Sequence, residues 1–535
     1  MPTLDLLHKP RHGELLEVEI DRLATDGCGE AQLEARLGPQ KLARVYTVRV
    51  RHALPGERVR VRVERTRRRE VEATLQTLLR AAPTRVEPRC VHFGAREVAG
   101  KGCGGCTLQS WDLGEQRRAK REMVARALGE AAGGVEIAPV VGVEGWHYRN
   151  KMELSFGDDR AREAALGLHP WGYRWEVFAL EACYLLSPAL APIAQAVTRW
   201  VRERGVAPYR HRDDSGFLRT LTVREGKRTG ERLVVLTTSA KARVAFGGGG
   251  GGDGRGGGAG ERLAREVVGD FAERLEACAR REDITLSGVV WTQHIARRGA
   301  PTRYVDEVLA GSGVLAERLE LPGGKSLTFE IHPRAFFQPN TLGAERLYAE
   351  VLLAAGVRGE LAGRGAVVRG ELAGRGAVVR GELSALRVLD LYCGTGTISL
   401  CLAPYVGAVC GVELSDVAVA NAAANAARNA LEHKARFVCG DVAKVLRAQP
   451  ELGANSDVVI VDPPRSGLTA RALELVASVG APRLVYVSCN PTALGRDLAA
   501  LAGRYRPLSI QPVDMFPQTA HVETVVALER VDGAV

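Results

Sequence analysis

The sequence lacks any uncharged apolar run of about 18 residues, the length that spans a membrane as a helix. Its first ten residues carry charge from Asp5 onward and never build the apolar stretch of a secretory signal. We therefore expect a protein that works in the cytoplasm without membrane contact. We also expect it to be a monomer. Eleven cysteines, an odd number, then predict free thiols, metal ligands or nucleophiles rather than disulfides.

The composition also excludes a disordered, collagen-like or small disulfide-stapled chain, because 46% of the 535 residues are hydrophobic and 25% are charged. At about 150 residues per domain, this length predicts three or four domains. The net charge of +10 is unevenly distributed: residues 41–80 carry twelve Lys or Arg and four acidic residues, whereas residues 1–40 carry four and eight. The N-terminal region therefore has a basic face that suits a polyanionic partner.

Residues 13–79 alternate apolar and polar positions in short runs that are separated by Gly and Pro. This pattern is typical of short strands and predicts a small β-barrel over residues 1–80. Barrels of this size often bind oligonucleotides on one basic face. The alternative is a structural barrel whose charged face is merely solvated.

A second domain is predicted over residues 84–335, with a charged helix at 109–128 followed by mixed α/β sequence. Within it, residues 247–260 contain eleven Gly out of fourteen, which predicts a flexible inserted loop. Residues 358–368 recur unchanged at 369–379, and two copies cannot stack as a solenoid, so we interpret them as a duplication within a loop. From residue 386, strands and helices alternate, which predicts a doubly wound α/β domain over residues 336–535.

The first strand of this domain runs into a glycine turn and a helix within residues 388–403, a pattern that places a ligand at the helix N-terminus. Glu413 ends the next strand, where an acidic side chain can bind both ribose hydroxyls. The third glycine of the dinucleotide fingerprint is missing, and Asp390 before the turn suits the ammonium group of a methionine moiety. S-adenosylmethionine is therefore favoured over NAD, with Asp441 at the third strand end placed for the adenine.

Two further strand ends carry reactive groups. Asp462 is followed by two prolines at the end of a fourth strand, a feature of methyltransferase nucleobase sites, although a plain strand exit has the same form. Cys489 ends the next strand, at the edge where open sheets bind ligands. A cysteine there can be a simple apolar core residue. The Asn-Pro turn that follows exposes it beside the cofactor crevice, and we predict a catalytic nucleophile.

Four other cysteines form a second constellation: Cys90, Cys103, Cys106 and Cys183. The sequence Cys103-Gly-Gly-Cys106 presents two thiolates from one tight turn. Four thiolates suit an iron–sulfur cluster or tetrahedral zinc, and the spacing does not separate the two. A redox pair at Cys103 and Cys106 alone is the alternative.

Together these motifs resemble the TrmA/RumA-type RNA uracil-5-methyltransferases, which make 5-methyluridine in ribosomal and transfer RNA. The resemblance covers nearly the whole chain, including a TRAM-like N-terminal barrel. Its motifs lie at residues 90–94, 103–109, 148–153, 166–169, 217–224, 336–340, 390–397, 462–465, 488–491 and 514–523. The chain differs in the Gly-rich loop, the tandem repeat and an insertion around residues 96–102 that lengthens the gap after Cys90.

The resemblance implies a role for each motif residue. A four-iron (4Fe–4S) cluster would be bound by Cys90, Cys103, Cys106 and Cys183; S-adenosylmethionine would lie near Gln338, Tyr392, Thr397, Glu413, Asp441 and Asp462; Cys489 would be the nucleophile and Glu523 the base. Because relatives with a TRAM-like barrel act more on ribosomal substrates, the implied substrate is a uridine of 23S rRNA. A tRNA uridine is the alternative, and a non-catalytic iron–sulfur RNA-binding protein is a third reading.

The chemistry explains why the implied reaction needs a thiolate. Carbon 5 of uracil is too weak a nucleophile to attack a methylsulfonium, but addition of the Cys489 thiolate at carbon 6 creates an enolate that can. We expect the surroundings of Cys489 to lower its pKa. After methyl transfer the carbon 5 proton must leave, and Glu523 would accept it. A uridine in folded RNA must be flipped out to reach such a site, while the basic face of the barrel and the cysteine-bearing domain hold the surrounding RNA.

Overall fold

The computed structural model describes residues 6–37, 40, 42–94, 102–158, 163–173, 175–246, 260–297, 299–357 and 385–531. The predicted Gly-rich loop, apart from Gly260, and the tandem repeat lie outside the described residues, as does nearly all of the insertion at 96–102. No helix in the described part of the chain is long and apolar enough to cross a membrane.

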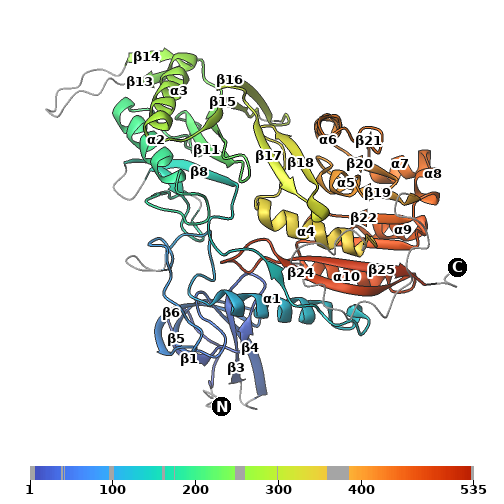
Figure 1. Cartoon of the computed structure of the whole chain (residues 1–535). Helices are drawn as coiled ribbons and strands as arrows, with labels where there is room; N and C mark the ends of the chain where they lie inside the picture. Colours follow the sequence, from blue (N-terminus) through green and yellow to red (C-terminus); the bar gives the residue numbers. More distant parts are fainter. Residues whose placement is uncertain are drawn as a thin grey trace.

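The N-terminal residues form one six-stranded sheet around its own core (Figure 1). Its strands are β1 (Leu15–Glu19), β2 (Arg22–Leu23), β3 (Gly29–Leu37), β4 (Leu42–Val50), β5 (Arg58–Arg67) and β6 (Glu70–Arg80), in the order β1-β5-β6-β4-β3-β2. Because β1 and β2 are the two edges yet follow each other closely in the chain, the sheet curls back on itself. A TRAM-like RNA-binding role for it stays a prediction.

The charged face of this sheet is partly neutralised by ion pairs. Along β5, Val59, Val61 and Val63 are buried, and the arginines between them are exposed. Arg58 and Arg60 both bind the Glu17 carboxylate on β1, at 3.0 and 2.7 Å. The acidic excess of residues 1–40 therefore offsets part of the basic excess of residues 41–80.

The middle of the chain builds a seven-stranded sheet with two helices (Figure 1). The strands, in sheet order, are β10 (Phe178–Ala179), β9 (Ala164–Leu168), β8 (Lys151–Asp158), β11 (Leu218–Glu225), β12 (Arg232–Ser239), β15 (Leu286–Ile295) and β16 (Arg303–Gly311). Helices α2 (Leu190–Arg204) and α3 (Ala264–Arg281) share its core, where the rings of Trp200 and Phe271 lie 5.3 Å apart. Strands β13 (Arg243–Phe246) and β14 (Gly260–Leu263) form a separate pair that flanks the Gly-rich loop.

The C-terminal part is the predicted doubly wound α/β fold (Figure 1). Its strands, in sheet order, are β21 (Ala435–Cys439), β20 (Ala408–Glu413), β19 (Arg387–Leu391), β22 (Val458–Val461), β23 (Arg483–Ser488), β25 (Glu523–Arg530), β24 (Tyr505–Asp514) and β7 (Val141–Gly142). Its helices include α4 (Thr341–Ala354), α5 (Thr397–Leu402), α6 (Asp416–Arg428), α7 (Val442–Ala448), α8 (Glu451–Ala454), α9 (Ala470–Val479) and α10 (Pro491–Leu501). The strand order reverses direction between β19 and β22, and such a switch point opens a crevice at the carboxyl ends of the strands.

Segments from outside the predicted C-terminal domain complete this unit. Helix α1 (Leu113–Leu128), predicted at 109–128, packs against α10, and β7 extends the sheet by pairing with β24. The hairpin of β17 (Leu315–Glu320) and β18 (Ser326–Ile331) shares a core with α4 and the sheet, although it precedes the predicted boundary at residue 335. This C-terminal unit is therefore assembled from distant parts of the chain.

Candidate active site

Three reactive side chains meet at one edge of the C-terminal sheet. Asp462 follows β22 and Cys489 follows β23 directly, whereas Glu523 begins the antiparallel strand β25. The register pairs Ser488 with Thr524, so the carboxyl end of β23 lies beside the start of β25. The structure thus brings together the predicted nucleophile, the predicted base and the predicted nucleobase-site carboxylate.

Burial and mutual repulsion change the acidity of all three groups. Desolvation, followed by the nearby Asp462 charge, raises the pKa of Glu523 to about 8. Desolvation likewise raises the pKa of Asp462 to about 7, and Asp390 adds to this shift. The pKa of Cys489 rises to about 11, first through desolvation and then through Glu523 and Asp462. The expectation of a lowered thiol pKa is therefore wrong, because desolvation, with two carboxylates beside it, outweighs the effect of the one arginine that lowers this pKa.

That arginine is Arg465. The sequence indicated it only as the last residue of the motif at 462–465 and predicted no role for it. Its charge opposes the rise in the pKa of Cys489. Its carbonyl accepts a hydrogen bond of 2.8 Å from the Asn490 side chain, and its guanidinium lies 3.4 Å from the His521 ring. The turn after β22 thus touches both the residue after Cys489 and the segment that leads to Glu523. Only the folded sheet reveals this, because the three segments are far apart in sequence.

The glycine turn after β19 has the predicted open conformation. Tyr392, Gly394 and Gly396 all have positive φ, at 66°, 55° and 71°. A Cβ atom at Gly396 would lie 2.6 Å from the Phe437 ring, so only glycine fits there. Glu413 accepts hydrogen bonds from the amide of Gly394 at 3.1 Å and from the amide of Ser415 at 2.9 Å. The end of β20 therefore fixes the turn.

Asp390 has a free acceptor at the base of this crevice. One carboxylate oxygen accepts a 2.6 Å hydrogen bond from Ser399, while the other is buried and has no hydrogen-bond partner among the described residues. Burial raises its pKa to about 7. An unsatisfied buried carboxylate oxygen is costly, so this position favours a cationic or hydrogen-bond-donating ligand.

The other predicted cofactor residues lie around the same crevice. Thr397 begins α5, and Asp441 caps α7 by accepting a 3.1 Å hydrogen bond from the amide of Lys444. The segment that contains Gln338 approaches the turn, because Thr395 donates a 3.2 Å hydrogen bond to the carbonyl of Phe336. The arrangement has the glycine turn, the acidic strand ends and a covering segment that an adenosyl ligand needs.

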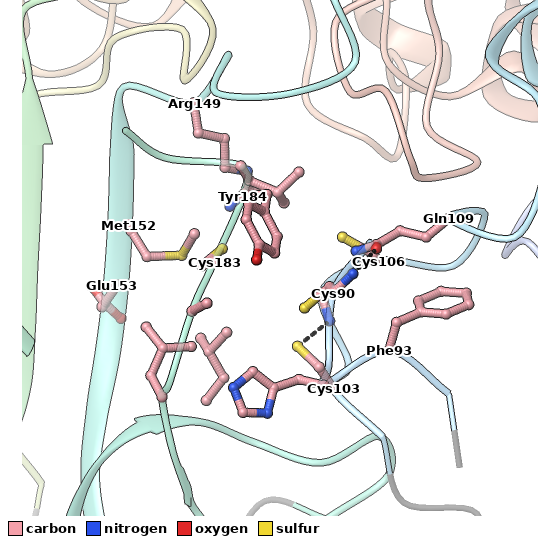
Figure 2. Close-up of a pocket in the computed structure, with 16 residues that line it drawn as sticks. Cys90, Phe93, Cys103, Cys106, Gln109, Arg149, Met152, Glu153, Cys183 and Tyr184 are labelled. Carbon is pink, nitrogen blue, oxygen red and sulfur yellow. Dashed lines mark hydrogen bonds between the residues drawn. The ribbon is translucent and has the colours of Figure 1, made fainter. Parts of the chain in front are cut away.

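The four cysteines of the second constellation line one cavity of about 200 Å³, here called the cysteine cavity (Figure 2). Figure 2 shows Cys90, Cys103 and Cys106 on one side, with Cys183 facing them. Burial raises the pKa of Cys103 to about 11 and that of Cys106 to about 12, and the neighbouring thiols add to both shifts. All four are free thiols.

The donor set fits a thiophilic metal group, but its geometry is not that of a formed site. Four thiols in a cavity that Phe93, Met152 and Leu185 also line match the ligands of a cluster or of zinc. As the described side chains are placed, no three from His, Cys, Asp or Glu are grouped closely enough to hold a metal ion.

Comparison with known proteins identifies the family. A family model described as tRNA (Uracil-5-)-methyltransferase matches residues 378–531. An uncharacterized RNA methyltransferase of Protochlamydia amoebophila is 35% identical over 485 residues, which is 89% of this chain and 98% of that protein. The chain belongs to the TrmA/RumA-type family of RNA uracil-5-methyltransferases. It is therefore an RNA methyltransferase enzyme.

Two further matches cover almost the entire methyltransferase. An uncharacterized RNA methyltransferase of Caldanaerobacter subterraneus subsp. tengcongensis is 32% identical over 526 residues, which is 97% of this chain and 99% of that protein. The crystal structure of the Pyrococcus abyssi tRNA (uracil-54, C5)-methyltransferase in complex with S-adenosyl-L-homocysteine has a TM-score of 0.63 at 23% identity. The structural match covers 96% of this chain and 100% of the Pyrococcus abyssi chain. This likeness shows a shared fold.

The RNA methyltransferase has a second, larger cavity of about 1190 Å³ on its central sheet, here called the central groove. Basic and aromatic side chains are prominent in its lining, which also includes Glu153 and Asp158. The basic and aromatic residues are Lys151, Trp175, Tyr209, Arg210, Arg212, Arg219, Tyr304 and Arg334. The Arg219 guanidinium lies 3.5 Å from the centre of the Tyr209 ring, and its Nε atom is buried with no hydrogen-bond partner in the part of the chain that the structure describes. Sequence reasoning singled out residues 217–224 but missed this groove, since its walls come from several separate stretches of chain between residues 151 and 334.

Proposed function

We propose that this enzyme transfers a methyl group from S-adenosylmethionine to carbon 5 of a uridine in 23S rRNA, through a covalent adduct with Cys489. The observation that carries the proposal is the shared position of Cys489, Glu523 and Asp462 beside the glycine turn. The choice of 23S rRNA rests on the N-terminal sheet and its analogy with TRAM-bearing relatives. A tRNA uridine is the alternative, since the matching family description names tRNA.

The raised pKa values indicate how protons move. At neutral pH the Cys489 thiol is protonated, so its proton must pass to a base as sulfur adds to carbon 6 of the uracil. Asp462, whose pKa of about 7 leaves much of it ionised at neutral pH, accepts the thiol proton. S-adenosylmethionine supplies the methyl group. The ionised fraction of Glu523 then takes the carbon 5 proton, the double bond re-forms and the Cys489 sulfur leaves.

We propose that the cysteine cavity holds a 4Fe–4S cluster, with zinc as the alternative. The support is the donor set of Cys90, Cys103, Cys106 and Cys183, gathered from three segments of the chain. A bound cluster would tie these segments together. The insertion before Cys103 does not keep Cys90 from the cavity wall, which supports Cys90 as a ligand.

RNA next to the flipped uridine would occupy the central groove. Bases can stack on its aromatic rings while its arginines meet the phosphates, as in other single-strand binding surfaces. An Arg219→Ala variant should bind RNA about 5- to 150-fold more weakly, since Arg219 supports the Tyr209 ring and base–aromatic stacking is worth about 1–3 kcal/mol per base. An Arg265→Ala change on α3, where the arginine pairs with Glu307, serves as the control. Equal affinity of the two variants in a filter-binding assay would contradict this placement.

Covalent trapping tests the catalytic proposal. Cys489→Ala should bind RNA and S-adenosylmethionine yet form no adduct. Glu523→Gln should attack and methylate but fail to remove the carbon 5 proton, so a methylated protein–RNA adduct should accumulate. On a denaturing gel that adduct would run as a heavier, labelled band that nuclease removes. Normal turnover by Glu523→Gln, or an adduct with Cys489→Ala, would show that the roles are wrong.

The substrate is tested separately. Mapping 5-methyluridine in rRNA and tRNA from a strain that lacks the protein should show one missing position in 23S rRNA. A missing position in tRNA would favour the alternative. No missing position in either RNA, together with no methyl transfer to total RNA, would support a non-catalytic RNA-binding protein.

A further inference from the structure

The segment 515–522, here called the catalytic loop, joins β24 to β25 and ends at Glu523. Its successive carbonyl groups are held by residues that precede the central sheet in the chain. The Phe516 carbonyl accepts a 3.1 Å hydrogen bond from the Lys120 ammonium group, and the Pro517 carbonyl accepts a 3.0 Å bond from the Tyr148 hydroxyl. The position of the loop therefore depends on segments outside its own domain.

Gln518 makes the most extensive of these contacts. Its carbonyl accepts hydrogen bonds from the amides of Thr107 and Leu108, at 2.9 and 3.0 Å. The buried Gln116 side chain binds it twice: Gln116 Oε1 accepts from the Gln518 amide at 2.9 Å, and Gln116 Nε2 donates to Gln518 Oε1 at 3.1 Å. Gln518 has φ +68°, an unfavourable conformation for a non-glycine residue that persists when its surroundings determine it.

These contacts join the catalytic loop to the cysteine cavity. Thr107 directly follows Cys106, so the same short turn lines the cavity and donates to Gln518. Two residues beyond Gln518, Ala520 is buried in an apolar cluster with Leu108 and Trp111. The turn and the loop are thus linked by both hydrogen bonds and packing.

We propose that Gln518 is a positioning residue, which fixes Glu523 against the cysteine-bearing turn and makes catalysis depend on the state of the cavity. The inference rests on the proposed role of Glu523 as base. Its consequence is that damage at Cys106 should slow deprotonation at carbon 5 as well as weaken RNA binding.

Gln116→Met removes both side-chain bonds to Gln518 while keeping a similar length. Turnover should fall about 10- to 100-fold, because displacing a catalytic group by about 1 Å costs up to about 100-fold. KM for S-adenosylmethionine and for RNA should stay within twofold. Gln116→Met should also accumulate the methylated protein–RNA adduct, in smaller amount than Glu523→Gln does. General destabilisation of the protein would not produce this adduct. Gln511→Met is the matched control. Gln511 lies on β24, the strand that leads to the catalytic loop, but its side chain donates to the Pro139 carbonyl and not to the loop.

Gln518→Gly covers the case in which Gln116→Met does not fold, because glycine accepts the positive φ and keeps every backbone bond at this position, losing only the bond from Gln116 Nε2. It should also accumulate adduct. Hydrogen exchange within 515–522 should be faster in Cys106→Ser than in the wild-type protein. Two results would overturn this inference alone, provided that Glu523→Gln still forms the adduct. One is normal turnover in both Gln116→Met and Gln518→Gly. The other is unchanged hydrogen exchange of the loop in Cys106→Ser. Absence of adduct with Glu523→Gln would instead overturn the role of Glu523.

Discussion

Cys489 and the thiols of the cysteine cavity are both shielded from water, yet their neighbours differ in kind. Cys489 lies beside two carboxylates and Arg465, at the open edge of a sheet. Cys103 and Cys106 share their cavity with two other thiols and with apolar and polar side chains. Desolvation raises the pKa in both places, so acidity alone does not separate a reactive thiol from a ligand. What separates them is the neighbour that adds to the shift: carboxylates beside Cys489, other thiols beside Cys103 and Cys106.

The largest expected difference between the two sites is in methyl transfer. Cys489→Ala should lower turnover by on the order of 10⁴- to 10⁶-fold, as removal of a catalytic nucleophile does elsewhere. Cys410→Ala, a half-buried cysteine on β20, is the control and should remain active. Single-turnover transfer of labelled methyl groups measures both. If Cys410→Ala lost as much turnover as Cys489→Ala, the assignment of Cys489 as the nucleophile would be contradicted.

A smaller effect is expected at the cysteine cavity. Cys103→Ser and Cys106→Ser should lose iron and much of their RNA affinity, while S-adenosylmethionine binding largely survives because the cofactor crevice lies on another sheet. Anaerobically purified wild-type protein should be brown, with iron measurable by metal analysis. Stoichiometric zinc without iron would favour the alternative metal. Full iron content in Cys90→Ser would show that Cys90 is not a ligand.

The smallest effect concerns stability and pH. The pKa of Glu523 is raised to about 8 in the folded protein, so between its unfolded value of about 4.3 and pH 8 the folded state holds more protons. Its protonated form therefore contributes stability at low pH that is lost as the pH rises through about 8. Glu523→Gln, which stays neutral, should raise Tm relative to wild type more at pH 9 than at pH 6. A pH-independent difference in thermal unfolding would contradict a buried, protonated Glu523.

The sequence signals for this edge of the sheet are local, and the structure places the residues that carry them close together. Glycines at positive φ, an acidic residue at each strand end and a cysteine before Asn490 can all be recognised within a few residues. The doubly wound fold follows from the same alternation of strands and helices. The direction of the Cys489 pKa shift could not be predicted in this way, because it depends on side chains contributed by two other strands.

Charge at the N-terminal sheet shows the same limit. The basic excess of residues 41–80 is visible in the sequence, but its pairing with Glu17 and Glu19 depends on β1 lying beside β5 and close to the end of β6. The central groove could not be predicted from the sequence for a related reason. Arg219 and Tyr304 come together only when β11 and β16 join one sheet.

The fold class, the family and the residue types of the site can all be recognised from the sequence, because motifs and periodicity lie within short stretches of chain. Tertiary structure decided the proton affinities of Cys489, Asp462 and Glu523, since desolvation and repulsion act through space. It also decided that a turn beside Cys106 supports the catalytic loop, because those hydrogen bonds join residues about four hundred positions apart and exist only once the sheets have packed.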